Sequence, residues 1–264
     1  MEAFCIVVEL KAKDRILPVL YGDCVAHVEE ISLVEEDYLW DNVRVYVDGV
    51  PSMRQFLVVH SPSFFVGGRS VDAYMKAESP RAVAGFAHIL ENERDAAVHL
   101  QVSLEAESYV ERCMAWLDRA YTVSYYRADA CTFRPSCKHK ERAVLLTPEN
   151  VREYMPLASD HFIRRLGTAQ VYGYLNEGGR LVATSGVGFL TKGSFSISYT
   201  ETEPEFRNRG IAKCLTSLAS EPLIGRGLVG VYAADVENMA STGVAAGLGF
   251  LPYRRMRCFW KLGK

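Results

Sequence analysis

The sequence lacks a strong charge of one sign and any long run of hydrophobic residues. Its 30 lysines and arginines nearly balance its 32 acidic residues, which gives a formal net charge of -2. This balance provides no general attraction to nucleic acids or anionic membranes, so we expect neither as a partner. The only apolar run near the amino terminus, Phe4 to Val8, is too short for a signal peptide or a membrane-spanning helix. We therefore expect a cytoplasmic protein.

Cysteines are few and follow no regular framework. There are seven among 264 residues, and an odd number without regular spacing is typical of reduced thiols rather than of a disulfide scaffold. Cys131, Cys137 and His139 lie close together, but no second ligand pair with zinc-like spacing follows them. We therefore expect no metal site and interpret this stretch as a solvated linker.

The chain also contains no low-complexity segment, and 49% of its residues are hydrophobic. This composition predicts a folded core, and the length favours one large domain or two smaller ones. Residues 126–142, YRADACTFRPSCKHKER, form a charged break between an apolar helical pattern and a strand-like run. We therefore predict two domains, residues 1–138 and residues 139–264.

The first predicted domain has a mixed α/β pattern. Residues 43–47 alternate valine with other residues as on a half-buried strand, and residues 56–59 form another short apolar run. Residues 104–121 carry Val110, Met114 and Leu117 at helical spacing, which predicts a helix there.

The second predicted domain alternates strand and helix signals more clearly. Strands are predicted at residues 143–146, 171–175, 181–189, 195–199 and 228–233, and helices at residues 148–154, 161–166 and 211–225. The turn signal Glu177-Gly178-Gly179 predicts a hairpin between the second and third of these strands.

The stretch EFRNRGIAKCL, residues 205–215, places two arginines and a glycine between a strand and a helix. A helix start offers unpaired backbone N–H groups and about half a positive elementary charge, and glycine lets a ligand approach the backbone closely. Arg207 and Arg209 would reinforce the attraction for a phosphate. In isolation the pattern R-x-x-G-x-A is also typical of an ordinary loop entering a helix.

The wider order of these features resembles the GNAT N-acetyltransferase superfamily. Arg207, Gly210 and Ala212 match its R/Q-x-x-G-x-G/A turn, Asn238 and Ser241 form N-x-x-S at the next helix, and Gly249-Phe250 follows. This resemblance covers the chain from near residue 143 onward.

A fainter likeness covers the first half of the chain. LPVLYG at residues 17–22, His27 and YVDGVP at residues 46–51 resemble in order the amino-terminal region of glycine N-acyltransferases, whose two halves are both GNAT-like. Together the resemblances imply an α/β fold of the α+β type with two GNAT-like domains. Each would be a mixed, mostly antiparallel sheet flanked by helices, with the cofactor site in the C-terminal domain.

The resemblance implies that acetyl-CoA is the acyl donor and that residues 207–212 cradle its pyrophosphate. The expected cofactor-binding residues are Thr200, Thr202, Arg207, Asn208, Arg209, Gly210, Ile211, Ala212, Asn238 and Ser241. On local sequence alone, Asn238 and Ser241 fit a helix cap and a small packing residue equally well.

The sequence departs from the family pattern where an acid and a base are often found. Ser196 and Ala245 stand at those positions, and neither side chain can do that chemistry. The catalytic candidates are therefore Glu201, as a base, and Tyr199, as an acid or a substrate-positioning phenol. The alternatives are a solvated carboxylate and a packed ring.

Three further side chains are weaker candidates: Glu203 as a second carboxylate, Tyr253, and His161 at the acceptor cleft. The resemblance also implies that a backbone N–H near residues 199–202 stabilises the oxyanion.

The expected activity is transfer of an acetyl group to a primary amine of a small or amino-acid-like acceptor, by direct attack in a ternary complex. A longer acyl-CoA donor and a CoA-binding regulatory module without turnover remain open alternatives. We expect a monomer or a homodimer.

Overall fold

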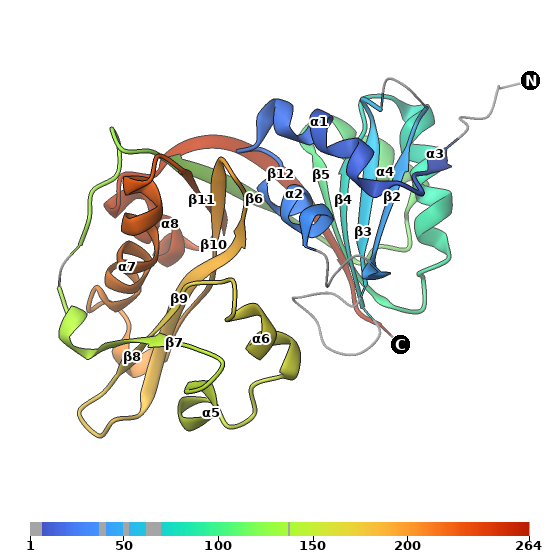
Figure 1. The fold of residues 1–264 in the computed structure, drawn as a ribbon. Coiled ribbons are helices and arrows are strands. Elements are labelled where there is room, and N and C mark those ends of the chain that lie inside the picture. The colour runs from blue at the N-terminus through green and yellow to red at the C-terminus, as the bar shows by residue number, and fades with distance from the viewer. Residues whose placement is uncertain (1–6, 37–40, 50–52, 62–69, 137, 264) are drawn as a thin grey trace, which may run out of the picture. The chain divides into compact units, whose positions relative to one another are not determined.

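The computed structural model describes residues 7–36, 41–49, 53–61, 70–136 and 138–263, with the backbone alone at His161. The chain forms two compact units, and Figure 1 labels their helices and strands. The first comprises Met1–Asp23, Glu30–Ser124 and Arg254–Lys264, and the second comprises Cys24–Glu29 and Tyr125–Tyr253. Each unit therefore contains segments that are far apart in the sequence.

The first unit is built on a mixed sheet. Its strands lie in the order β1 (Val8–Glu9), β2 (Val43–Val47), β3 (Phe56–His60), β4 (Ser70–Lys76), β5 (Ala97–Ser103) and β12 (Leu251–Lys261). Neighbouring strands are antiparallel except β4 and β5, which run parallel. A parallel pair requires a crossover connection, and the helix α3 (Pro80–Glu91) provides it.

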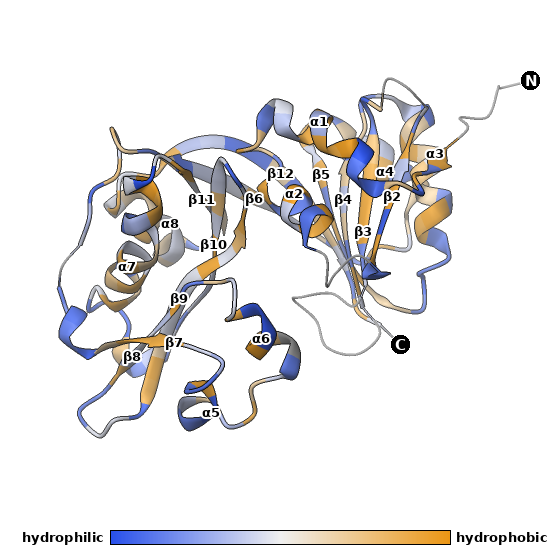
Figure 2. Cartoon of the chain, in the orientation of Figure 1, coloured by the Kyte–Doolittle hydropathy of each residue, from blue (hydrophilic) through white to orange (hydrophobic). Residues whose placement is uncertain are grey.

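Two helices pack on one face of this sheet. Helix α3 begins after Ser79, whose hydroxyl accepts the Ala82 amide at 3.2 Å, and its buried Phe86 joins strand residues such as Leu57 in one core. Helix α4 (Glu107–Cys113) contributes Val110 to the same core. Figure 2 shows β3 largely in hydrophobic colours, as expected for a strand covered on its faces. The unit also contains α1 (Leu17–Leu20) and most of α2 (Val28–Glu35).

The second unit repeats the same kind of architecture. Its strands lie in the order β11 (Val229–Asp235), β10 (Ser194–Thr202), β9 (Leu181–Leu190), β8 (Val171–Leu175) and β7 (Ala143–Leu146). These strands pair antiparallel except β10 and β11, which are parallel and joined by helix α7 (Ile211–Gly225). Helix α8 (Met239–Gly247) contacts α7, and both helices bury apolar residues against β10 and β11. The short helices α5 (Val151–Tyr154) and α6 (Asp160–Arg165) connect β7 to β8.

Two long strands each run from one unit into the other. Strand β6 (Arg119–Ala128) starts in the first unit and ends in the second, beside β11. Strand β12 starts in the second unit and ends in the first, where Met256–Lys261 pair with Val98–Ser103 of β5. Each unit is therefore completed by a strand that begins in the other one.

The predicted fold class is confirmed: the chain is α/β, with two GNAT-like units built on mixed, mostly antiparallel sheets. The strands predicted at residues 143–146 and 171–175 have those bounds, and the predicted hairpin is present. Among the described residues, no helix is long and apolar enough to cross a membrane.

The helix predicted over residues 104–121 is wrong beyond Cys113. Met114 leaves the helical conformation, with φ -127° and ψ 46°, and β6 begins at Arg119. Met114 and Leu117 still pack in or against the core of the first unit, so their helical spacing reflected burial rather than one continuous helix.

The boundary between the units differs from the predicted boundary at residues 138 and 139. The units divide between Ser124 and Tyr125, and the chain returns to the first unit at Arg254. Within residues 126–142, the first three residues end strand β6, and the described residues 129–136 and 138–142 form a largely exposed connection inside the second unit. A boundary drawn from composition assumes that each domain is one continuous stretch of sequence. That assumption fails here because strands β6 and β12 each have residues in both units.

Gly249 provides a test of the packing in the second unit. Its φ is +80°, and a Cβ built there would collide with the carbonyl oxygen of Thr132. Replacing Gly249 with alanine is expected to lower the free energy of unfolding by about 2–5 kcal/mol, because left-handed strain and overpacking add. Denaturant titration measures the change.

Gly225→Ala is the matched control. Gly225 is the last residue of α7, and a Cβ there meets no atom within 4 Å. This variant is expected to leave stability unchanged or to raise it by up to about 1 kcal/mol, because alanine favours the helix. Equal unfolding midpoints for the two variants would contradict the described packing at Gly249.

Candidate active site

The parallel pairing of β10 with β11 stops before either strand ends. The paired residues run from Ser194 with Val229 to Ile197 with Tyr232, whereas β10 continues to Thr202 and β11 to Asp235. The last part of β10 is therefore hydrogen-bonded to β9 on one side and open toward β11 on the other.

A β-bulge accompanies this separation. Three residue steps lead from Ser198 to Glu201 on β10, against two from Gly186 to Thr184 on β9. Such an extra residue bends the bulged strand and disrupts its ladder. Tyr199 within the bulge has a left-handed φ of 57°, and the Thr184 hydroxyl donates to its carbonyl at 2.8 Å. The bulge thus turns the end of β10 while its bonds to β9 persist.

A cavity of about 780 Å³ in the second unit is lined by β9, the ends of β10 and β11, and the first turns of α7 and α8. All the expected cofactor-binding residues line it except Arg209. They are Thr200, Thr202, Arg207, Asn208, Gly210, Ile211, Ala212, Asn238 and Ser241. The structure thus brings together residues that the sequence separates by about 40 positions.

The turn before α7 presents its backbone to this cavity. Asn208 and Gly210 have left-handed φ values of 61° and 82°, and Gly210 is the N-cap without any side-chain cap. A Cβ at Gly210 would meet no atom within 4 Å, so the space beside it is open. The first amides of a helix have no carbonyl partner within that helix, so Ile211 and Ala212 offer free donors here.

The two arginines of the turn play different parts. Arg207 lines the cavity, and its Nε donates to the Thr202 carbonyl at 2.9 Å. Arg209 does not line the cavity; its guanidinium donates to the Glu205 carbonyl at 2.8 Å and lies 5.2 Å from the Phe206 ring centre. Of the two guanidinium groups, that of Arg207 is the better placed to meet an anion in the cavity.

A chain of hydroxyl groups connects the cavity wall to the core. Tyr232 lies 3.0 Å from Ser241, while Ser185 lies 2.9 Å from Thr200 and 2.8 Å from Thr216. Burial raises the pKa of the Tyr232 phenol, and hydrogen bonds with Ser241 and Thr200 partly oppose that rise. The phenol therefore stays protonated and remains a donor at neutral pH.

Asn238 and Ser241 do serve as a helix cap. The Asn238 side-chain oxygen accepts the Ser241 amide at 3.0 Å, which satisfies one of the free donors of α8. Both residues also line the cavity. The same two residues therefore form the cap of α8 and part of the cavity wall.

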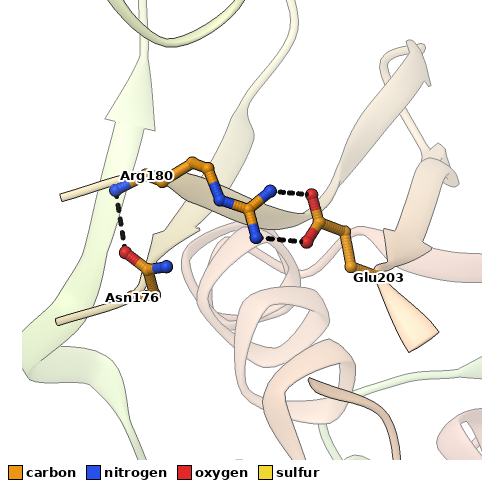
Figure 3. Close-up of polar contacts among 3 residues, drawn as sticks. All are labelled: Asn176, Arg180 and Glu203. Carbon is orange, nitrogen blue, oxygen red and sulfur yellow. Dashed lines mark hydrogen bonds and ion pairs between the residues drawn. The ribbon is translucent and has the colours of Figure 1, made fainter. Parts of the chain in front are cut away.

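The carboxylates at the end of β10 differ in their surroundings. Glu203 binds the Arg180 guanidinium through both oxygens, at 2.5 and 2.7 Å, and Asn176 in the hairpin accepts the Arg180 amide at 2.9 Å (Figure 3). Glu201 lines the cavity, is exposed and makes no ion pair in the described part of the chain. Glu201 is therefore the more available base.

The Tyr199 ring is not among the groups that line the cavity. It packs edge to face on Phe162 of α6, with ring centres 5.3 Å apart, beside a cluster that contains Val151 and Leu166. The bulge breaks the simple alternation of β10, so Tyr199 leaves the pattern that Phe195 and Ile197 follow. This placement favours the packed alternative for its side chain.

Ser196, Ala245 and Tyr253 do not line this cavity. Ser196 and Ala245 are buried, at 1% and 0% exposure. Tyr253 stacks with Arg127, whose guanidinium lies 5.2 Å from the ring centre. The side chains of His161 and Cys137 lie outside the described residues. Within the described part, no group of three metal-ligating side chains gathers.

Sequence reasoning missed Tyr232, Ser185 and Lys213 at or beside the cavity. Tyr232 lies inside an apolar run that reads as a plain core strand, and Ser185 lies in the middle of a strand with small residues around it. The hydroxyl partners of Tyr232 and Ser185 include Ser241 of α8 and Thr216 of α7, which lie on other elements and which local sequence does not display. The one available signal was the polar tip of a tyrosine within a buried strand.

No protein-family model and no curated protein sequence matches the chain, but solved structures do. A Drosophila protein matches at a TM-score of 0.71 and 12% identity, covering 98% of this chain and 99% of that one. A GCN5-related N-acetyltransferase-like protein from Streptococcus suis matches at 0.63 and 16%, covering 94% and 98%. A tandem GNAT protein from the clavulanic acid biosynthesis pathway matches at 0.59 and 15%, covering 98% of both chains.

These matches extend over both units, although the sequence resemblance was specific only in the second. None of the three is described as a glycine N-acyltransferase, so that finer likeness stays a prediction. The chain has the fold of the GNAT N-acetyltransferases, built as two GNAT-like units.

Proposed function

We propose that the chain is an N-acetyltransferase that moves an acetyl group from acetyl-CoA to a primary amine of a small or amino-acid-like acceptor. The observation that carries this proposal is the cavity between the separated ends of β10 and β11, with the glycine turn of α7 in its wall. The GNAT neighbours support acyl transfer as the reaction class. The proposal includes a cytoplasmic monomer or homodimer without a nucleic-acid or membrane partner.

The phosphate end of the donor fits the start of α7. Free amides of the first turn and the positive end of the helix dipole attract an anion, and Gly210 leaves space for it beside the backbone. Arg207 adds a charge at the same wall. In this proposal the diphosphate binds along residues 207–212.

The amide-bearing arm of the donor fits the open edge of β10. An extended chain with amide groups can add to an exposed strand edge by backbone hydrogen bonds, and β10 has such an edge beyond Ile197. The Thr202 hydroxyl is buried beside the cavity and has no hydrogen-bond partner within the described part of the chain. A bound ligand would supply that partner, since a buried hydroxyl without one is costly.

Glu201 is the proposed base. An amine must be neutral to attack the thioester carbonyl carbon, and an alkylamine with a pKa near about 10.4 is almost fully protonated at neutral pH. Glu201 would accept the amine proton, directly or through water. A free β10 amide would stabilise the oxyanion as the carbon–sulfur bond breaks, and the sulfur leaves as a thiolate, which needs less acid assistance than an alkoxide.

Calorimetric titration with acetyl-CoA, longer acyl-CoAs and free CoA tests the binding part of the proposal. Wild type is expected to bind acetyl-CoA, and Gly210→Val is expected to weaken that binding at least about tenfold because its side chain occupies the phosphate approach. Preference among acyl chains decides the donor. Absence of binding to every compound would reject the proposal.

Gly227→Val is the matched control for that experiment. Gly227 has a φ of +87° and an open Cβ position, as Gly210 does, but it lies beyond the far end of α7 and does not line the cavity. Both variants are expected to lose a similar amount of stability through left-handed strain. Only Gly210→Val is expected to lose affinity, and equal loss in both would show that strain alone is responsible.

Glu201→Gln tests the chemical part of the proposal. The variant is expected to lower kcat by about 10²-fold or more with little change in the dissociation constant of acetyl-CoA, because glutamine cannot accept the amine proton. Glu205→Gln is the control, since Glu205 is exposed, lies four residues further along and does not line the cavity. Wild-type turnover of Glu201→Gln on an accepted amine would remove Glu201 as the base.

A further inference from the structure

The polar connection between β6 and β7 packs on the second unit beside the candidate site. We call its described part, residues 129–136 and 138–142, the strap; Figure 1 shows it looping along that unit. The Arg134 amide donates to the Leu248 carbonyl at 2.8 Å, and the Ser136 amide donates to the Ser217 hydroxyl at 2.8 Å. The strap is therefore fastened to α7 and to the end of α8.

His139 of the strap bonds to the backbone of the glycine turn. Its Nε2 lies 2.9 Å from the Arg209 carbonyl oxygen, and because a carbonyl only accepts, Nε2 carries the hydrogen. The ring also meets Tyr174 of β8 edge to face, at 6.1 Å between centres. His139 has a left-handed φ of 68°, which is costly for a residue other than glycine. Its surroundings hold it in place despite that strain.

This bond determines where the next backbone donor points. In a planar trans peptide the carbonyl oxygen and the following N–H lie on opposite sides, so holding the Arg209 oxygen toward His139 turns the Gly210 amide away from it. Gly210 itself imposes little preference, because glycine tolerates either orientation of the preceding peptide. The orientation of a donor in the phosphate turn is thus set from outside the turn.

We propose that His139 is a positioning residue for the phosphate turn: it holds the Arg209–Gly210 peptide in the orientation that binds the donor diphosphate. This proposal rests on the proposed function, since it takes the turn to be a phosphate site. His139 does not line the cavity and acts on the ligand only through the Arg209 carbonyl. The effect of losing it falls on affinity for the phosphorylated donor.

The test compares three variants of the full-length protein by calorimetry with acetyl-CoA. His139→Ala removes the donor and is expected to raise the dissociation constant about 3- to 10-fold, the equivalent of one ordinary hydrogen bond. His139→Gln restores an N–H near the position of Nε2 and is expected to stay within about twofold of wild type. Arg142→Ala removes an exposed ion pair of the strap with Glu177 and is expected to bind as wild type does.

Kinetics with two donors separate positioning from general structural damage. For His139→Ala, the KM for acetyl-CoA is expected to rise while kcat at saturation is retained. The KM for S-acetylpantetheine, which lacks the diphosphate, is expected to stay unchanged. A parallel rise for both donors would overturn the proposal, as would equal impairment of His139→Ala and His139→Gln, which would assign the effect to ring packing.

The outcomes distinguish this proposal from the proposed function. If wild type fails to bind acetyl-CoA, the phosphate site at the turn is rejected, and the proposed role of His139 is rejected with it. If wild type binds and His139→Ala binds equally well, the cofactor site stands and the role of His139 is overturned.

Discussion

The second unit depends on a parallel pair of strands whose hydrogen-bonded pairing stops before either strand ends. Beyond Ile197 and Tyr232, β10 no longer pairs with β11, and its free end is held by other means. The Thr184 hydroxyl donates a hydrogen bond to the Tyr199 carbonyl, and Arg207 donates one to the Thr202 carbonyl. Arg180 forms an ion pair with Glu203. Thr184 lies on β9 and Arg180 directly precedes that strand, so these two contacts hold the end of β10 from the side of β9 and leave the edge that faces β11 available.

The same constraint explains why the cavity is built on rigid elements. Its walls are strands that pair with other strands of the sheet and helices that share an apolar core with β10 and β11. The hydroxyls of Ser185 and Thr216 anchor the polar wall from within that core. Polar groups that are hydrogen-bonded to other protein groups already have a fixed orientation before a ligand arrives. Less conformational entropy is therefore lost on binding.

Much of this arrangement was readable from local pattern, and the rest depends on long-range pairing. Residues 143–146 and 171–175 have strand periodicity, and Arg207 to Ala212 combine a glycine with a helix start, so their roles follow from neighbours in sequence. The direction of the Tyr199 side chain could not be predicted, because a one-residue bulge shifts each later side chain of the strand relative to simple alternation. Tyr232 was missed because its hydroxyl partner lies on another element. The paths of β6 and β12 were missed because no local signal shows that a strand continues from one unit into the other.

The exchange of β6 and β12 between the units has a thermodynamic consequence. A fragment that ends near residue 138 lacks β12, which borders β5, and the complementary fragment lacks β6, which borders β11. Each half would expose an unpaired strand edge, so the halves are interdependent rather than autonomous folding modules.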